Sequence, residues 1–248
     1  MSGIGTGYDL STTTYSPDGR VFQIDYAQKA VDSSGTAIGI RCKDGVVVAV
    51  EKPVISKMLV EGSNRAVFPV HTHAGLAATG VPPDSRMVVN HAMDECSRYK
   101  SFYGEDIPGH VLAERLGGFF HTYTLVWYVR PFGAAALVAV YGDDGPQLYL
   151  CEPNGNAHRF FGTAIGKGRQ AAKTEIERLD LQNITCREAV AEIAKMMYKL
   201  RDDEKPFELE MGWVSDESGR KFVRVPADLV AQAESGAKAA MESDMEDD

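Results

Sequence analysis

Short turns between apolar segments are the feature of this sequence that most restricts its fold. The apolar segments 36–42 and 46–52 are separated by a turn containing Asp44-Gly45, and Asp-Gly between two such segments is a strong sign of a β-hairpin. A second pair of apolar segments flanks the turn at 142–146. Strands joined by such short turns run antiparallel, because a parallel connection needs a dozen or more residues. We therefore expect antiparallel sheets rather than a parallel sheet wound with helices.

The order of the remaining elements extends this expectation to the whole chain. Apolar residues at helical spacing predict helices at 20–32, from 82, at 108–123, from 167, from 185 and at 226–241. Further strands are predicted at 66–70, 74–79, 158–161, 207–214 and 221–225. The economical arrangement is an α+β fold: a four-layer αββα sandwich of two antiparallel sheets, each covered by a helix pair, with an added N-terminal helix. One domain is expected over 1–240.

The first thirty residues combine a flexible arm, a turn and a helix. Glycines at positions 3, 5 and 7 keep the arm, 1–9, from forming a regular element on its own. Pro17 and Gly19 suit the two corners of a turn before the helix 20–32. That helix has apolar stripes on two sides, so a single core does not cover it. It either lies on its own domain alone or is clamped between neighbouring subunits.

Composition excludes several classes of protein. There is no apolar run of 18 residues, so no membrane span is expected. The four cysteines are scattered without a CxxC pair, which favours free thiols in a reducing compartment. Five acids in the last eight residues account for much of the net charge of −9, and nothing suggests a nucleic-acid surface. We expect 241–248 to be an acidic disordered tail, in which Ser243 among acids is a candidate for phosphorylation by acidophilic kinases.

The motifs that would carry chemistry are weak. In the glycine-rich segment 162–168, three residues separate Gly162 from Gly166, whereas a phosphate loop needs four between its glycines. In addition, Gly168 follows the lysine at the position where a phosphate loop needs Ser or Thr. We predict a close turn into a helix there, with no nucleotide or other cofactor. His71 and His73 share one face of a strand, which suits a metal but is more typical of a solvated edge. No metal site is therefore predicted.

Several motifs resemble one known family. The residues that carry the resemblance are YD at 8–9, YSPDGR at 15–20, FQIDYA at 22–27, VRPFG at 129–133 and AIGKGRQAAKTEIE at 164–177. The first three resemble the N-terminal signature of proteasome alpha subunits, and the others extend the match across nearly the whole chain. This resemblance implies a sandwich of the N-terminal-nucleophile hydrolase type. It also implies a non-catalytic subunit of the outer ring of the 20S core particle, in the cytoplasm and nucleus.

The resemblance also implies a gate and a set of partners. Tyr8, Asp9, Pro17 and Tyr26 match the family's gate cluster, which holds the arms of neighbouring subunits in an open arrangement. The arm would otherwise lie over the pore through which protein substrates enter. The implied partners are the other alpha subunits of a seven-membered ring, the beta subunits of the adjoining ring, and regulatory particles or activators.

Two alternative functions remain beside this one. The first is a threonine peptidase released at Gly35-Thr36, with the new terminal amine as the base. Against it, the nucleophile position aligns with Gly35, the acid position lies near Glu51, and the activating lysine position falls on Ala66. The second alternative is a standalone binding protein with a sandwich fold.

One departure from the family pattern concerns activators. Many alpha subunits have a lysine near position 66 that pairs with the C-terminal carboxylate of an activator tail, but this chain has Ala66. Arg65 is the neighbouring cation, although successive residues of a strand point to opposite faces. The sequence therefore argues against tail docking at this subunit's own lysine position, with Arg65 as the substitute to examine.

Overall fold

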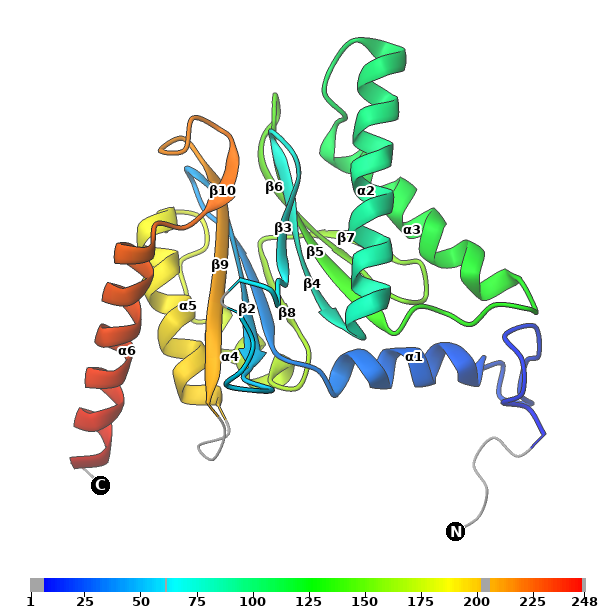
Figure 1. Cartoon of the computed structure of the whole chain (residues 1–248), viewed down its shortest axis with the longest axis horizontal. Coiled ribbons are helices and arrows are strands. Elements are labelled where there is room, and N and C mark those ends of the chain that lie inside the picture. The colour runs from blue at the N-terminus through cyan, green and yellow to red at the C-terminus, as the bar shows by residue number, and fades with distance from the viewer. Residues whose placement is uncertain (1–6, 61, 202–205, 247–248) are drawn as a thin grey trace.

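Two five-stranded sheets face each other at the centre of the computed structural model (Figure 1). The structure describes residues 7–60, 62–201 and 206–246, without the side chains of 242–246. The first sheet has the spatial order β10 (Phe222–Arg224), β9 (Phe207–Ser215), β2 (Gly45–Pro53), β1 (Ala37–Arg41) and β8 (Gly162–Ile165). The second has the order β3 (Val67–His71), β4 (Ala74–Gly80), β5 (Ala134–Gly142), β6 (Gly145–Cys151) and β7 (Ala157–Phe160). All their pairings are antiparallel, as predicted.

The predicted hairpins are confirmed, and glycine is required at one of them. Arg41 pairs with Val46 at the end of the first hairpin, and the Cys42 N–H donates to the Gly45 carbonyl at 2.7 Å. A Cβ on Gly45 would lie 2.3 Å from the Val214 carbonyl oxygen of the neighbouring strand. No larger residue fits this turn without displacing the sheet.

The core between the sheets is made of small and branched apolar side chains. Val48 of β2, Leu137 of β5 and Leu148 of β6 are fully buried there. Gly39 lets the sheets approach, because a Cβ at this position would lie 2.9 Å from a Leu148 methyl carbon. Burying branched side chains of this size contributes about 1.5–3 kcal/mol each.

Helices cover both outer faces and complete the predicted αββα sandwich (Figure 1). The sheet β3–β7 is covered by α2 (Pro82–Tyr103) and α3 (Gly109–Leu125). The other sheet is covered by α4 (Arg169–Ile176) and α5 (Cys186–Leu200), and α6 (Ala227–Glu246) packs beside α5. This face therefore has three helices where the sequence predicted a pair. None of the helices in the described part of the chain combines the length and apolar character of a membrane span.

The last helix is longer than predicted. The helix α6 continues to Glu246, beyond the predicted end at 241. Residues 241–246 contain no glycine or proline, and Met and Glu favour helix. In α3, Gly117 lets the turn between β6 and β7 approach the helix, because a Cβ at this position would lie 2.7 Å from the Gly155 carbonyl oxygen.

The N-terminal helix α1 (Phe22–Asp32) runs along the edge of the sandwich, beside the ends of β4 and β5 (Figure 1). Phe22, Ala27 and Val31 are buried against the domain, whereas Tyr26 remains 41% exposed. The domain thus buries Ala27 and Val31 of one predicted apolar stripe and Phe22 of the other, the stripe that also contains Tyr26. The helix begins at Phe22 rather than Arg20, because the Arg20 backbone belongs to the preceding turn.

Candidate functional site

The turn before α1 forms as the sequence predicts. The Ser16 N–H donates to the Arg20 carbonyl at 2.8 Å, and the Gly19 N–H donates to the Ser16 carbonyl at 2.9 Å. Gly19 has a φ of 73°, a conformation that glycine adopts without strain. Pro17 lies exposed at the first corner. This closed turn sets the direction in which the chain enters α1.

Asp9 is the residue that fastens the N-terminal segment to α1. Its carboxylate Oδ2 accepts a hydrogen bond from the Tyr26 hydroxyl at 3.2 Å. Its backbone carbonyl accepts a second hydrogen bond, from the Gln23 side-chain amide. Burial, followed by this bond to Asp9, raises the pKa of Tyr26, so the phenol stays protonated and available as a donor. The sequence did not single out Gln23, whose position one turn before Tyr26 on the same helix was the available signal.

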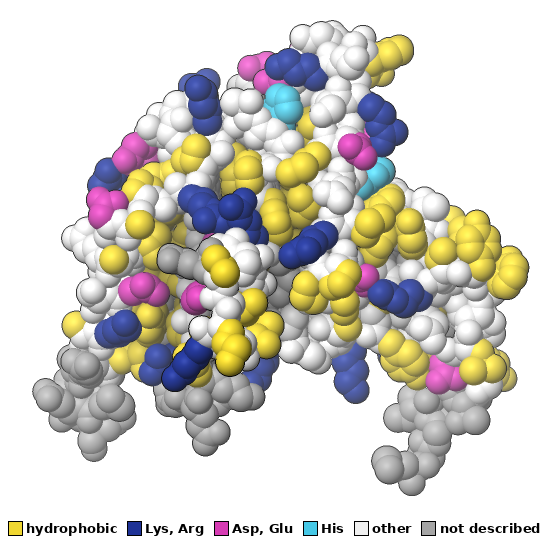
Figure 2. Space-filling view, viewed as in Figure 1, with side chains coloured by type: hydrophobic (Ala, Val, Ile, Leu, Met, Phe, Trp, Pro, Cys, Tyr) yellow, Lys and Arg dark blue, Asp and Glu magenta, His cyan; other side chains and the backbone are white. Residues whose placement is uncertain are grey.

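Of the four predicted gate residues, the structure joins two by a hydrogen bond. Asp9 and Tyr26 are in contact, whereas Tyr8 remains 42% exposed and Pro17 is exposed at its turn. Leu10 and Tyr15 nearby are also exposed, by 88% and 71%. Figure 2 shows hydrophobic side chains gathered on the surface at this end of the molecule. Residues 1–6 of the predicted arm lie outside the described residues.

The position of a hydrolase nucleophile is closed by the backbone. A Cβ on Gly35 would lie 2.2 Å from the Glu51 carbonyl oxygen, so no side chain with a hydroxyl fits there. Thr36, the next residue, is 2% exposed, and its hydroxyl accepts the Gly168 N–H at 3.1 Å. Its own N–H is part of a peptide bond and donates to a Glu51 carboxylate oxygen at 3.3 Å. Neither residue offers a free amine beside a free hydroxyl.

The prediction of a close turn over 162–168 is correct only for 166–168, which lead into α4, because residues 162–165 form strand β8. The Lys167 N–H donates to the Ser34 carbonyl at 2.9 Å, and Gly166, at a φ of 90°, packs against the Gly35 backbone. The concave side of this loop is therefore filled by residues 34–36 of the same chain.

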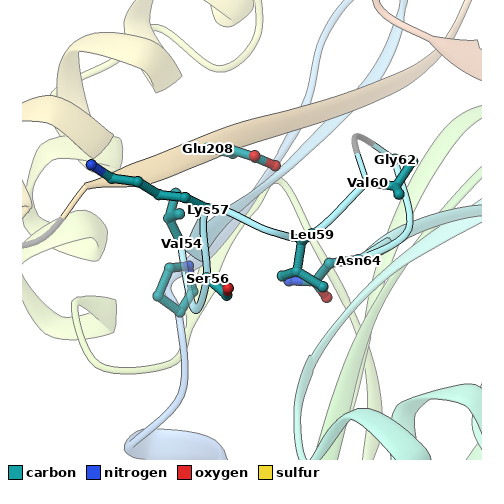
Figure 3. Close-up of a pocket in the computed structure, with 9 residues that line it drawn as sticks. Val54, Ser56, Lys57, Leu59, Val60, Gly62, Asn64 and Glu208 are labelled. Atoms are coloured by element: carbon teal, nitrogen blue, oxygen red, sulfur yellow. The ribbon is translucent and has the colours of Figure 1, made fainter.

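Several pockets border the loop between β2 and β3, and two of them are also lined by residues of β2. One, of about 120 Å³, is lined by residues of this loop, among them Val54, Lys57 and Leu59, and by Glu208 of β9 (Figure 3). The other, of about 250 Å³, lies between the end of α1 and strands β2 and β4, and Arg65 is among its lining residues. Both pockets are small relative to the sites of drug-sized ligands.

Arg65 and Ala66 have different surroundings. Arg65 is exposed, and its Nε donates to the Gly62 carbonyl of its own loop at 3.2 Å. Ala66 is half-buried, and its N–H donates to a carboxylate oxygen of Glu210 at 2.9 Å. Both residues line the larger pocket. The candidate phosphorylation residue, Ser243, lies in α6, and its side chain is outside the described residues.

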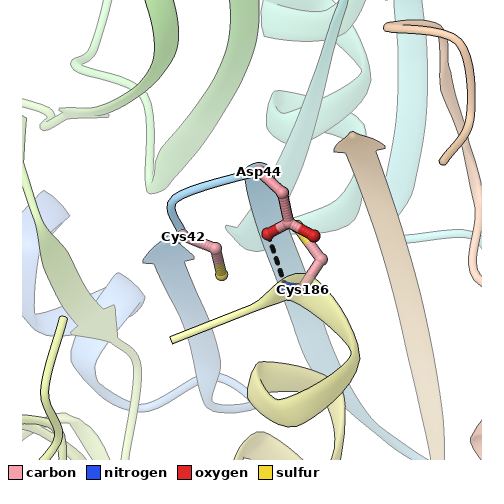
Figure 4. A group of neighbouring side chains, drawn as sticks. All are labelled: Cys42, Asp44 and Cys186. Carbon is pink, nitrogen blue, oxygen red and sulfur yellow. Dashed lines mark hydrogen bonds between the residues drawn. The ribbon is translucent and has the colours of Figure 1, made fainter. Parts of the chain in front are cut away.

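The cysteines are free and buried, as predicted for reduced thiols. Cys42 and Cys186 lie together with Asp44 where the first hairpin meets the start of α5 (Figure 4). The Cys186 N–H donates to Asp44 Oδ1 at 2.8 Å, so Asp44 caps the helix. Hydrogen bonding with Cys42 and burial raise the pKa of the Cys186 thiol. A protonated, buried thiol is a poor metal ligand and a poor nucleophile.

The prediction of a solvated edge for the histidine pair was wrong. His73 is 8% exposed, because the segment between α2 and α3 that contains Asp106 and Ile107 packs over it. His71 is half-buried beside it.

Family models identify the group of proteins to which this architecture belongs. Residues 31–214 match the model described as proteasome subunit. Residues 8–30, from Tyr8 through most of α1, match the model for the N-terminal signature of A-type proteasome subunits. The chain belongs to the proteasome subunit family. The segment that carries the Asp9–Tyr26 contact is thus the segment that distinguishes its alpha type.

Relatives along the full length agree with the alpha type. The alpha type-3 proteasome subunit of Oryza sativa subsp. japonica is 54% identical over 244 residues, which cover 98% of each chain. That of Acanthamoeba castellanii is 53% identical over 243 residues, 97% of this chain and 96% of its own. A probable alpha type-7 proteasome subunit of Schizosaccharomyces pombe is 44% identical over 249 residues, with 100% and 98% covered. The segments GYDLS, RPFG and KTEIE and the acidic tail resemble the type-3 subunit most, and the two type-3 relatives confirm this resemblance.

Proposed function

We propose that this alpha-type proteasome subunit is a non-catalytic member of the outer ring of the 20S core particle and that its N-terminal segment helps to gate substrate entry. The observation that carries the gating proposal is the double attachment of Asp9 to α1, through Tyr26 and Gln23. This attachment fixes the root of the arm 1–9 while leaving Tyr8 exposed for a neighbouring subunit. An arm held at its root changes direction when the contacts around Asp9 change.

The absence of catalysis is proposed from the closed nucleophile position. A threonine peptidase of this family type requires a hydroxyl and a free amine on one terminal residue. Gly35 has no room for a side chain, and Thr36 is buried with its hydroxyl bonded to Gly168. The subunit would therefore act by shaping the entrance, while other subunits cleave the substrate.

The proposed partners are two neighbouring alpha subunits, the beta subunits of the adjoining ring, and the regulatory particles that dock on the outer ring. The exposed hydrophobic side chains around the N-terminal segment support a surface that is covered by another protein. The proposed location is the cytoplasm and nucleus, which suits four free cysteines.

Isolation of the tagged chain from cells tests the assembly. A ring subunit is expected to elute in a particle far heavier than its own 27.0 kDa, and native mass spectrometry of that particle should identify alpha and beta subunits. Elution of all the tagged chain at its own mass would instead support a standalone binding protein.

A further inference from the structure

Two histidines and one aspartate converge where the turn between β3 and β4 meets the segment between α2 and α3. The Nδ1 atoms of His71 and His73 are 2.9 Å apart. Asp106 Oδ1 is 3.7 Å from His71 Nδ1, and Asp106 Oδ2 is 3.9 Å from His73 Nδ1. One possible ligand atom from each of the three residues thus lies within 4.8 Å of the other two.

A hydrogen bond determines which tautomer His73 adopts. His73 Nε2 is 2.8 Å from the carbonyl oxygen of Ile107. A carbonyl can only accept, so Nε2 carries the proton, and a neutral His73 has a lone pair on Nδ1. That lone pair points to His71, whose Nδ1–H donates to it.

We propose that His71, His73 and Asp106 form a binding site for a divalent transition-metal ion of the zinc class. Zinc holds imidazole nitrogen and carboxylate oxygen at about 2.0–2.2 Å in a tetrahedron, which places neighbouring ligand atoms about 3.3 Å apart. The separation of the two Nδ1 atoms, 2.9 Å, and that of His73 Nδ1 from Asp106 Oδ2, 3.9 Å, each lie within about 0.6 Å of this edge. Imidazole and carboxylate are ligands that suit zinc and its neighbours in the transition series.

The surroundings of the three side chains fit a metal site. A metal-bound histidine usually donates its other N–H to a carbonyl or carboxylate, as His73 does to Ile107. Lys100 Nζ lies 2.6 Å from Asp106 Oδ1, which leaves Oδ2 as the ligand atom. The Asp106 side chain is 42% exposed, so an ion can enter from solvent past it.

Binding requires one proton to change position and none to be lost. His71 must give up the proton on Nδ1 and take one on Nε2, which converts one neutral tautomer into the other. Two neutral imidazoles and one carboxylate then provide three ligands, and water completes the tetrahedron. The ion would tie the β3–β4 turn to the α2–α3 segment, independently of the gate residues.

Titration of the metal-free full chain with Zn²⁺ tests the proposal by calorimetry. One ion is expected per chain. His73→Ala and Asp106→Asn should each weaken binding about tenfold or more. The matched control is His158→Ala, because His158 is an exposed histidine on β7 outside the cluster. It should bind as the wild type does. Absence of Zn²⁺ binding, or equal affinity in Asp106→Asn and wild type, would overturn the proposal.

A second measurement guards against a variant that does not fold. Asp106→Asn conserves volume at a partly exposed position, so its circular dichroism should match that of the wild type. Zn²⁺ should raise the thermal midpoint of the wild type and of His158→Ala, because an ion that binds only the folded state stabilises it. At the same Zn²⁺ concentration, the midpoint of Asp106→Asn should rise less than that of the wild type. An equal increase in all three proteins would place the ion elsewhere and reject this site.

Discussion

At the scale of a single residue, Gly35 leaves no room for a side chain at the position that aligns with a hydrolase nucleophile. The position of the hydrolase nucleophile is occupied by the one residue that fits beneath the Glu51 carbonyl. The sequence predicted that the nucleophile and the activating lysine are missing, from the alignment of Gly35 and Ala66 with those two catalytic positions. It did not predict that the Thr36 hydroxyl would be bonded to the Gly168 N–H, because that contact joins residues far apart in the chain.

A substitution of Gly35 tests the closed position. Gly35→Thr is expected to destabilise the chain by about 1–3 kcal/mol, because the new side chain must displace the backbone near Glu51. It should produce no peptidase activity. Urea unfolding measures the loss. Gly118→Ala is the matched control: a Cβ there meets open space on α3, and alanine should stabilise the helix by up to about 1 kcal/mol. Equal stability of Gly35→Thr and the wild type would contradict the closed geometry.

Tyr26 is the second test at this scale. Tyr26→Phe removes the hydroxyl that donates to Asp9 but retains the ring. If this bond supports the open arrangement, hydrolysis of a fluorogenic peptide by activator-bound particles should fall, while basal hydrolysis stays unchanged. Tyr15→Phe, which alters an exposed tyrosine outside the Asp9 contact, should have no effect. Full stimulation of the Tyr26→Phe particle would remove Tyr26 from the gate.

At the scale of elements, the hairpins and helices were predictable because their signals are local. The turn Asp44-Gly45 specifies a hairpin, and the capping box of Thr185 and Glu188 specifies the start of a helix, each within a few residues. In that box the Thr185 N–H donates to Glu188 Oε2 at 2.8 Å, and the Glu188 N–H donates to Thr185 Oγ1 at 3.3 Å. Other contacts join segments that are distant in the chain: β2 pairs with β9, and Gly117 packs against the backbone of Gly155. Periodicity gives no information on such partners.

The start of α2 depends on one ion pair that the sequence did not reveal. Asp84, in the first turn, receives two hydrogen bonds from Arg130, at 2.6 and 2.8 Å. It also accepts the Gly133 N–H at 2.9 Å. Burial opposes ionisation, but the bonds from Arg130 and Gly133 outweigh it and lower the pKa of Asp84. The corner 130–133 thus anchors the start of the helix.

The lowered pKa of Asp84 predicts a dependence of stability on pH. A carboxyl group with a lower pKa in the folded state stabilises the fold above its unfolded pKa, about 3.9, and loses this contribution as the pH falls through the folded value. Asp84→Asn should therefore reduce the free energy of unfolding by about 1–3 kcal/mol at pH 7. The difference from the wild type should shrink below about pH 4. Urea unfolding across this range measures both effects.

Asp94→Asn provides the control for that series, because Asp94 is exposed on the same helix. It should change stability by less than about 0.5 kcal/mol. A constant difference between Asp84→Asn and the wild type down to pH 2 would show that ionisation of Asp84 does not contribute.

At the scale of the whole molecule, the sandwich supplies a rigid body and the N-terminal segment supplies the contacts that reach beyond it. The domain buries Phe22, Ala27 and Val31 of α1 but leaves Tyr8 and Tyr26 partly exposed. The sequence predicted apolar residues on two sides of this helix but not which of them the domain covers: Phe22 and Tyr26 lie on one predicted stripe, and only Phe22 is buried. What covers the exposed side is a property of the assembly, and no pattern within one chain specifies it.

Deletion of residues 1–9 from the assembled particle tests the gating role most directly. Removal of both the arm and its attachment point is expected to raise basal hydrolysis of a short fluorogenic peptide in the absence of activator. With an activator bound, deleted and complete particles should hydrolyse the peptide equally, because the entrance is then already open. To exclude redundancy, the deletion is also made in particles from which the arms of the other alpha subunits are removed in turn. Basal hydrolysis that is the same with and without residues 1–9 in every such background would contradict the proposal that this segment gates entry.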